Sequence, residues 1–196
     1  NYNVAVGYNA GGAVTTGVNN TLIGGLAGDS ITTGSNNVAL GQAALGAYQG
    51  SNSTAVGYNA LSIATGVENQ AFGTRALQGT TTGQENTAVG RSAMVTNTSG
   101  SFNTAVGKQA LQNNTTASQN VAVGYKAGYS NQTATYNTYV GSYAGENSTG
   151  TSNTFIGDGS GWQVTTGSKN TILGTYNGNG GGLDIRTSSN NIVLSD

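Results

Sequence analysis

The chain has 196 residues, of which only 7% are charged, and six Lys plus Arg against seven Asp plus Glu give a net charge of −1. It contains no His and no Cys, which excludes zinc sites with the usual ligands, thiol catalysis, disulfides and Ser-His-Asp triads. The few cations form no basic stripe, so nucleic acid is not an expected partner. No apolar run reaches the ~18–20 residues of a membrane span, so membrane insertion is not expected either.

A five-residue motif, written Asn-Thr-Ala-Val-Gly in its commonest form, occurs twelve times along the chain with small changes. Its copies are spaced by 16 or 17 residues, except for a last interval of 21. A fixed period this short is typical of a solenoid in which each repeat is one coil. The copies are residues 3–7, 20–24, 37–41, 53–57, 69–73, 86–90, 103–107, 120–124, 137–141, 153–157, 170–174 and 191–195.

Within the motif, side chains alternate with a period of two, which predicts a short strand. The residue before the glycine is large and apolar in every copy, as in Val6, Leu40 and Val106, and we expect it to fill the interior of the coil. The residue before that is mostly Ala, which is poor in strands. We therefore expect another backbone or sheet to approach the Ala face closely, so that both faces of the strand are covered; the alternative is that Ala faces solvent.

The ends of the motif predict a corner. Asn tolerates left-handed backbone and bonds its own turn, and stacked Asn side chains can also form an amide ladder. The closing glycine indicates a positive φ or close backbone contact. Both residues are thus interpreted as structural.

The rest of each coil contains an Ala-Leu segment, a second and weaker strand, and a corner rich in Thr and Gly. Val14, Ile31, Tyr48 and Val164 lie seven residues after their glycines and are expected to point inward. The predicted fold is therefore all-β: a two-sided parallel β-roll, or β-solenoid, of about twelve coils of 16–17 residues.

Residues 1–174 contain the regular repeats, and residues 175–196 form a last coil with a Gly-rich insertion. Ile185 then falls where Val164 falls one coil earlier, so we expect the insertion to be a loop in a coil that continues. Because the chain begins with Asn1 rather than Met, two residues before a motif, we expect it to be a fragment, a processed form or the ordered part of something longer. The last coil is expected to lead into a further C-terminal region.

Residues 103–111, Asn-Thr-Ala-Val-Gly-Lys-Gln-Ala-Leu, and residues 120–127 resemble the head repeats of YadA-like trimeric autotransporter adhesins and the repeats of chaperone-terminated phage tail fibres. The resemblance covers essentially the whole chain. It implies a left-handed roll and a side-by-side homotrimer with the small motif residue facing the trimer core. The trimer-interface candidates carried over in this way are Ala5, Ala39, Ala55, Ala71, Ala88, Ala105, Ala122, Tyr139, Phe155, Ile172 and Val193.

The resemblance implies a structural and adhesive fibre segment, located outside the cell, on a cell surface or on a virion. Its partners would be other copies of itself and a cell-surface glycan or protein receptor, with no cofactor. Binding residues are expected at corners, where side chains vary without disturbing the roll. Tyr8, Tyr58 and Tyr125, directly after motif glycines, are the surface-binding candidates; alternatively they only decorate the corner.

Two other functions remain open. Thr residues two before the large apolar position, such as Thr87 and Thr104, form a row that an ice- or surface-binding solenoid could use, although they share the face of the expected core residues. A glycan-cleaving spike would need a carboxylate pair roughly 5 to 9.5 Å apart. Glu68 and Glu85 fall at equivalent positions in adjacent coils but have no supporting residues, so the chain is not expected to be an enzyme.

Overall fold

The computed structural model describes residues 2–195, which form one elongated stack of coils. These residues contain β-strands, turns and bends but no helix, and so no helix that could cross a membrane. The strands are β1 (Val4–Val6), β2 (Thr21–Ile23), β3 (Val38–Leu40), β4 (Thr54–Val56), β5 (Gln70–Phe72), β6 (Thr87–Val89), β7 (Thr104–Val106), β8 (Val121–Val123), β9 (Thr138–Val140), β10 (Thr154–Ile156), β11 (Thr171–Leu173), β12 (Asn179–Gly180), β13 (Leu183–Asp184) and β14 (Ile192–Leu194).

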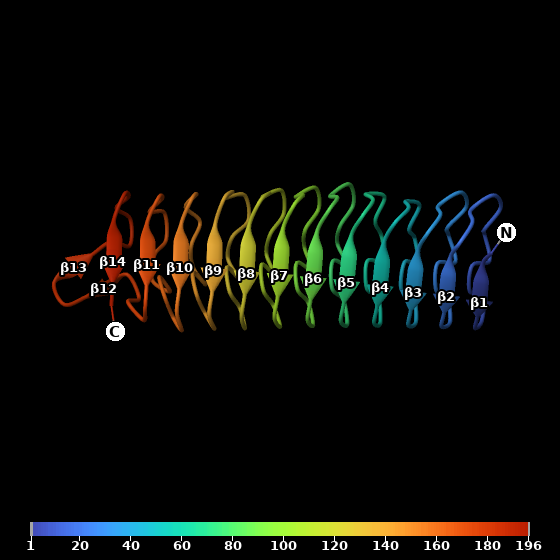
Figure 1. Ribbon diagram of the computed structural model, residues 1–196, viewed down its shortest axis with the longest axis horizontal. Coiled ribbons are helices and arrows are strands. Elements are labelled where there is room, and N and C mark those ends of the chain that lie inside the picture. Colours follow the sequence, from blue (N-terminus) through green and yellow to red (C-terminus); the bar gives the residue numbers. More distant parts are fainter. Residues whose placement is uncertain (1, 196) are drawn as a thin grey trace.

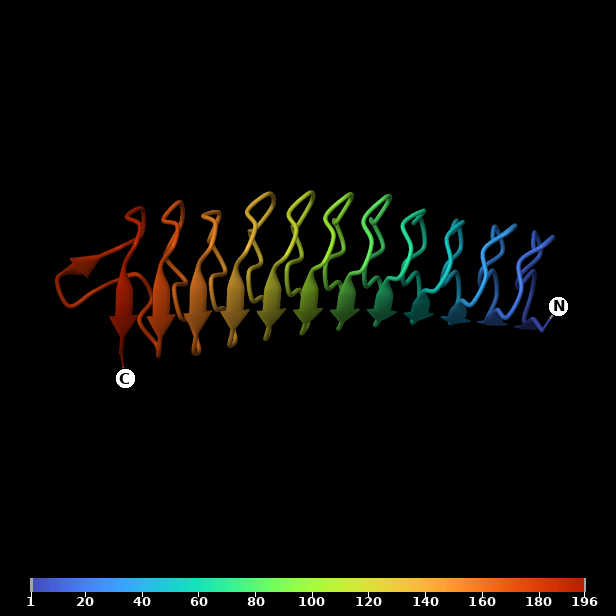
Figure 2. The ribbon, with the colours of Figure 1, turned by 45° about the horizontal axis from the view of Figure 1, so that its top comes forward.

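Each motif contributes one three-residue strand, and these strands form a single 12-stranded sheet in the order β1 to β11 followed by β14. All neighbours are parallel and in register, so that equivalent motif residues face each other, as Ala88, Ala105 and Ala122 do. Figure 2 shows the strand arrows pointing the same way along the whole stack. The predicted parallel β-solenoid with a spacing of about 17 residues is thus confirmed.

The wall opposite the sheet consists of turns, so the prediction of a second strand was wrong. Two residues of this wall, the second and fourth after the glycine, have left-handed backbone, for example Asn59 (φ 53°) and Leu61 (φ 48°). A strand needs extended backbone, which these residues lack. The coils are still joined on this side, because Leu61 N–H donates to Ala76 O at 2.9 Å.

The expected inward burial on this wall was correct. Ile31, Tyr48 and Val164 are fully buried, and Val14 packs against the core from a partly buried position.

The two faces of the sheet are the reverse of those predicted. The middle residue of the strand points into the chain's own core, and the large apolar residue before the glycine points outward. The interface candidates are therefore covered by their own chain, except in the first coil, where Ala5 is exposed, and in the last, where Val193 is half-buried. The fully buried ones are Ala39, Ala55, Ala71, Ala88, Ala105, Ala122, Tyr139, Phe155 and Ile172.

The reason for the reversal is the width of the core. Where the strand carries Ala, as at Ala105, the fourth residue after the glycine is usually large, as at Leu111. Where the strand carries a ring, that fourth residue is glycine: Gly145 lies against Tyr139, and Gly161 lies against Phe155. Large and small residues thus alternate across the core, as close packing demands.

The motif Asn residues form a buried ladder. Asn103 Oδ1 accepts a hydrogen bond from the backbone N–H of Asn120 at 3.0 Å, and Asn103 Nδ2 donates to Ala117 O at 2.8 Å and to Asn86 Oδ1 at 3.1 Å. The predicted ladder is confirmed. The left-handed residue, however, is the one before the Asn, such as Phe102 with φ 60°, and not the motif Asn itself.

One step of the ladder is altered, because Ser53 replaces Asn. The Ser53 Oγ still accepts from Asn69 N–H at 3.1 Å, and the Tyr48 hydroxyl donates to this Oγ at 2.6 Å. Burial raises the pKa of Tyr48 to about 12, although the hydrogen bond with Ser53 acts in the opposite direction. A buried tyrosine therefore fills the room that the shorter serine leaves.

The motif glycine combines both predicted properties. Gly7 has φ +133°, and a Cβ there would lie 2.6 Å from the carbonyl oxygen of Gly24 in the next coil. Any side chain would force the coils apart at this corner.

The Gly-rich insertion is a short antiparallel hairpin of β12 and β13 that projects from the end of the stack. The chain then returns to the coil: Ile185 is buried, Thr165 N–H donates to Arg186 O at 2.8 Å, and β14 pairs with β11. The insertion is thus a loop in a coil that continues, as predicted.

Replacing Asn103 with Ala should destabilise the chain. The substitution leaves the Asn120 N–H buried without a partner and removes one of the two donors to the Ala117 carbonyl, which keeps Asn114 Nδ2 at 3.1 Å. The expected cost is about 1–3 kcal/mol. Chemical denaturation measures this loss. Gln42→Ala is the control, because Gln42 is exposed; equal stability of the two variants would contradict the structural role of the ladder.

The direction of the strand faces is tested by enlarging one Ala in the middle of a strand and one exposed Ala in a turn. Ala105→Leu should overpack the core opposite Leu111 and lower the free energy of unfolding by about 1–3 kcal/mol. Ala47→Leu is the same change at an exposed position, and its effect should stay within about 0.5 kcal/mol. Thermal unfolding of both variants compares them, and a neutral Ala105→Leu would show that Ala105 does not face the core.

Candidate functional site

Two surfaces of the stack differ from a plain solubilising surface: the outward face of the sheet, and the corner that follows the motif glycine. The first is defined here as the outward rows, which are the first and third residues of the twelve paired strands. The second is the corner ridge, which contains the first, second and fifth residues after each motif glycine.

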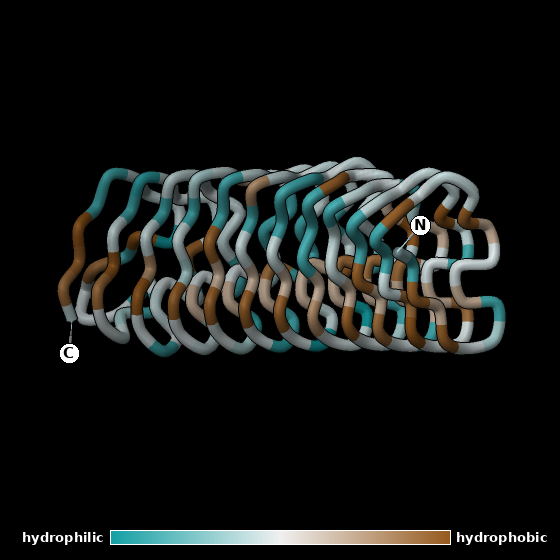
Figure 3. Tube along the Cα trace, turned by 45° about the vertical axis from the view of Figure 1, so that its right-hand side comes forward, coloured by the Kyte–Doolittle hydropathy of each residue, from teal (hydrophilic) through white to brown (hydrophobic). Residues whose placement is uncertain are grey.

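The outward rows are uncharged, and the row of third residues is apolar throughout. The third residue of each strand is a large aliphatic or aromatic side chain, and many of these are more than a third exposed, such as Leu40 at 46% and Phe72 at 40%. Figure 3 shows hydrophobic segments recurring from coil to coil along the stack. The third residues are Val6, Ile23, Leu40, Val56, Phe72, Val89, Val106, Val123, Val140, Ile156, Leu173 and Leu194.

The Thr row belongs to the same outward face. Thr87 and Thr104 pair directly as the first residues of β6 and β7, and both are half-buried. The expectation that these threonines share a face with the large apolar residues was correct, but that face is the outer one. The row is interrupted by Val38, Gln70 and Val121.

The tyrosine candidates lie at equivalent positions of the corner ridge but not together. Tyr8 is 82% exposed and Tyr58 is 49% exposed, and each comes from a different coil several turns from the next. The structure therefore places them on the surface, as predicted, without assembling them into one site.

Tyr125 alone belongs to a cluster. Its ring makes an edge-on contact with Tyr143, with centroids 5.1 Å apart and an interplanar angle of 80°. Lys108 Nζ lies 5.4 Å from the Tyr125 centroid. Contacts of this kind attract an ammonium group to the ring face.

Lys126 is the centre of the cluster. Its Nζ lies 5.0 Å from the Tyr129 centroid, 5.8 Å from that of Tyr125 and 5.9 Å from that of Tyr143. It also donates to Glu146 Oε1 at 3.1 Å. This hydrogen bond is the main reason that the pKa of Lys126 is raised above its ordinary value.

A pocket of about 420 Å³ lies next to this cluster, lined by Tyr143, Glu146, Asp158, Gly159 and Trp162. None of these five was singled out from the sequence as a binding residue. The available signal was their register: Tyr143 and Glu146 are the second and fifth residues after Gly141, and the other three are the first, second and fifth after Gly157. Reading the corner positions across neighbouring coils would have found them.

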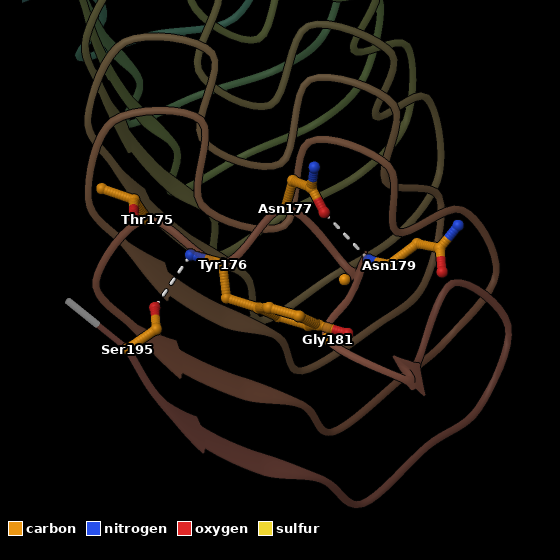
Figure 4. Close-up of a pocket in the computed structure, with 7 residues that line it drawn as sticks. Thr175, Tyr176, Asn177, Asn179, Gly181 and Ser195 are labelled. Carbon is orange, nitrogen blue, oxygen red and sulfur yellow. Dashed lines mark hydrogen bonds between the residues drawn. The ribbon is translucent and has the colours of Figure 1, made fainter.

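A second pocket of about 350 Å³ lies at the C-terminal end and is shown in Figure 4. Its lining includes Tyr176, whose N–H donates to Ser195 Oγ at 2.9 Å, and Asn179, whose N–H donates to Asn177 Oδ1 at 2.9 Å. The Tyr176 hydroxyl also donates to Leu183 O, which ties the hairpin to the coil. No charged side chain lines this pocket.

The acidic residues do not assemble into a metal site or a supported pair. Residues 2–195 hold no group of three or more His, Cys, Asp or Glu side chains close enough to bind one ion. Glu68 and Glu85 are exposed at successive corners. At the C-terminal end of the stack, the hydrogen-bonded ion pair of Arg186 with Asp184 (2.8 Å) lowers the pKa of Asp184 to about 2.

Comparison with family models, curated proteins and solved structures finds no match to this chain. The functional argument therefore rests on the fold and on these two surfaces.

The Lys126–Glu146 pair predicts a pH dependence. Because the folded-state pKa of Lys126 is raised, the stabilising contact is complete below the ordinary Lys pKa of about 10.4 and is lost as the pH rises through the folded-state value. Glu146→Gln should lower the pKa of Lys126 toward its ordinary value. An NMR titration of the Lys side chains tests this, with Lys169 as an internal reference, and an unmoved Lys126 titration would contradict the contact.

Proposed function

We propose that this chain is a structural and adhesive segment of an extracellular fibre, assembled as a side-by-side homotrimer that attaches to a surface receptor. The observation that carries the proposal is the uncharged outward face of the sheet, in which the third strand residues form a row of large apolar side chains along the whole stack. A contiguous exposed apolar surface typically marks a contact with another macromolecule.

A second copy of the same chain suits this face. The outward rows run the length of the stack, which at ~4.8 Å per step over eleven steps is roughly 50 Å. A partner with the same coil spacing matches such a surface along its whole length, whereas a globular partner covers only part of it. The outward rows contain no charged residue, so no like charges oppose each other when the faces meet.

The trimeric state and the left-handedness of the roll are implied by the resemblance to YadA-like heads and tail-fibre repeats. In this proposal the chains associate through their outward rows rather than through the Ala row, because the Ala side chains are buried within each chain. Receptor contacts are assigned to the corner ridge, whose side chains vary from coil to coil and stay clear of the sheet.

Light scattering coupled to size exclusion tests the assembly. The chain of 19.5 kDa should elute with three times that mass. Val106→Lys, which places a charge in the outward rows, should convert it to monomer because an ammonium buried without a partner is costly. Ser99→Lys, at an exposed Thr-Gly corner, is the matched control and should stay trimeric; a monomeric wild-type protein would overturn the proposal.

An ice- or surface-binding solenoid is the second candidate, favoured by the outward position of the Thr row on a parallel, in-register sheet. Thr54, Thr87 and Thr104 are regularly placed for such a role, while Val38, Gln70 and Val121 interrupt it. Thermal hysteresis of a monomeric protein, lost in Thr87→Lys, would support this function over the fibre.

A further inference from the structure

Among the second positions of the corner ridge, one carries glycine, so that the neighbouring side chains surround a space that no side chain fills. The ridge residues of three successive coils are the relevant set. They are Tyr125, Lys126 and Tyr129 after Gly124, Ser142, Tyr143 and Glu146 after Gly141, and Asp158, Gly159 and Trp162 after Gly157.

The surroundings of Lys126 show which chemical group the corner ridge can bind. Its ammonium group lies over the Tyr129 ring at 5.0 Å from the centroid and donates to Glu146 Oε1 at 3.1 Å. The Lys126 side chain is 26% exposed and that of Glu146 is 14% exposed. The ridge therefore binds an alkylammonium group of its own between aromatic rings and a carboxylate.

Two coils further on, Gly159 takes the place of Lys126. A Cβ at Gly159 would meet no atom within 4 Å, and the space is the pocket of about 420 Å³. Asp158 occupies the position equivalent to Tyr125, and Trp162 occupies that of Tyr129. In the earlier coils this second position always carries a side chain, as in Asn59, Arg75 and Lys126.

The lining has the chemistry of a cation site. Trp is the ring that attracts a cation most strongly, and Trp162 is 43% exposed and Tyr143 38% exposed. Two carboxylates line the pocket, and only that of Glu146 is paired, with Lys126. Among residues 2–195, no side chain or backbone group bonds to the Asp158 carboxylate.

We propose that the Gly159 pocket binds a primary alkylammonium group, such as a lysine side chain of a receptor. The ammonium donates a hydrogen bond to Asp158 and lies against the Trp162 ring, while its alkyl chain packs on Tyr143. The preference for a primary amine follows from the hydrogen bond, which a quaternary ammonium cannot donate. This inference rests on the proposed receptor-binding role for its biological meaning, but the pocket itself is complete within one chain.

The test uses the fluorescence of Trp162, the only tryptophan of the chain. The intact protein is titrated with n-butylammonium chloride, with n-butanol and choline as probes of equal or similar size, at constant ionic strength. We expect a saturable change with butylammonium, and binding weaker by about tenfold or more for butanol and choline, since each lacks either the charge or the N–H donors.

Three variants connect the signal to the pocket. Asp158→Asn should weaken butylammonium binding by about tenfold or more, because the charge-assisted hydrogen bond is lost. Gly159→Lys should abolish binding by placing an ammonium in the pocket; its backbone (φ +63°) matches that of Lys126 (φ 54°), so the coil accepts a Lys there. Glu85→Gln removes an exposed carboxylate elsewhere and should leave binding unchanged.

Several outcomes would overturn the inference: no saturable response to butylammonium, unchanged affinity in Asp158→Asn, or tighter binding of butanol, choline or a neutral sugar such as methyl glucoside. The fibre proposal is judged separately by the mass in solution. A trimer that does not bind butylammonium loses only the pocket assignment, and a monomer that binds it loses only the fibre assignment.

Discussion

The core of each coil is one pair of side chains wide, and the rest of the structure depends on this constraint. The middle strand residue and the fourth residue after the glycine face each other across it, as Ala105 and Leu111 do, or Tyr139 and Gly145. If one member is large, the other must be small, because interiors are close-packed. Only one row of the strand can therefore point inward, and the large residues beside it must point outward.

The same constraint explains which features could be predicted from the sequence. The period of the motif predicted the coils, their register and the corner glycines, because these depend on spacing and backbone conformation alone. The direction of the strand faces could not be read from hydrophobicity, since Val106 is more apolar than Ala105 yet lies outside. Comparing Tyr139 with Gly145, and Phe155 with Gly161, would have indicated the inward row, because their sizes compensate.

The candidate site was predicted only in part for a related reason. Regular positions of a solenoid serve the stack, so a tyrosine at a corner, such as Tyr58, carries little information by itself. The pocket arises from an exception to the pattern, in which Gly159 replaces a side chain while its neighbours Asp158 and Trp162 remain. Such an exception is visible only when equivalent positions of adjacent coils are compared with one another.

The outward rows and the corner ridge are separate surfaces, so the proposed association of chains and the proposed receptor binding use different residues. The outward rows are uncharged along the whole stack, and their third residues are large and apolar in every strand, which suits a partner with the same repeat. The corner ridge varies in charge and size from coil to coil, from Tyr8 to Lys126 to Trp162. Because the strand residues and the corner residues are separated by the invariable backbone contact at the glycine, a change on the ridge leaves the sheet unaltered. If the chain is the fibre segment proposed above, its receptor contacts can therefore vary without a change in the surface on which its chains would associate.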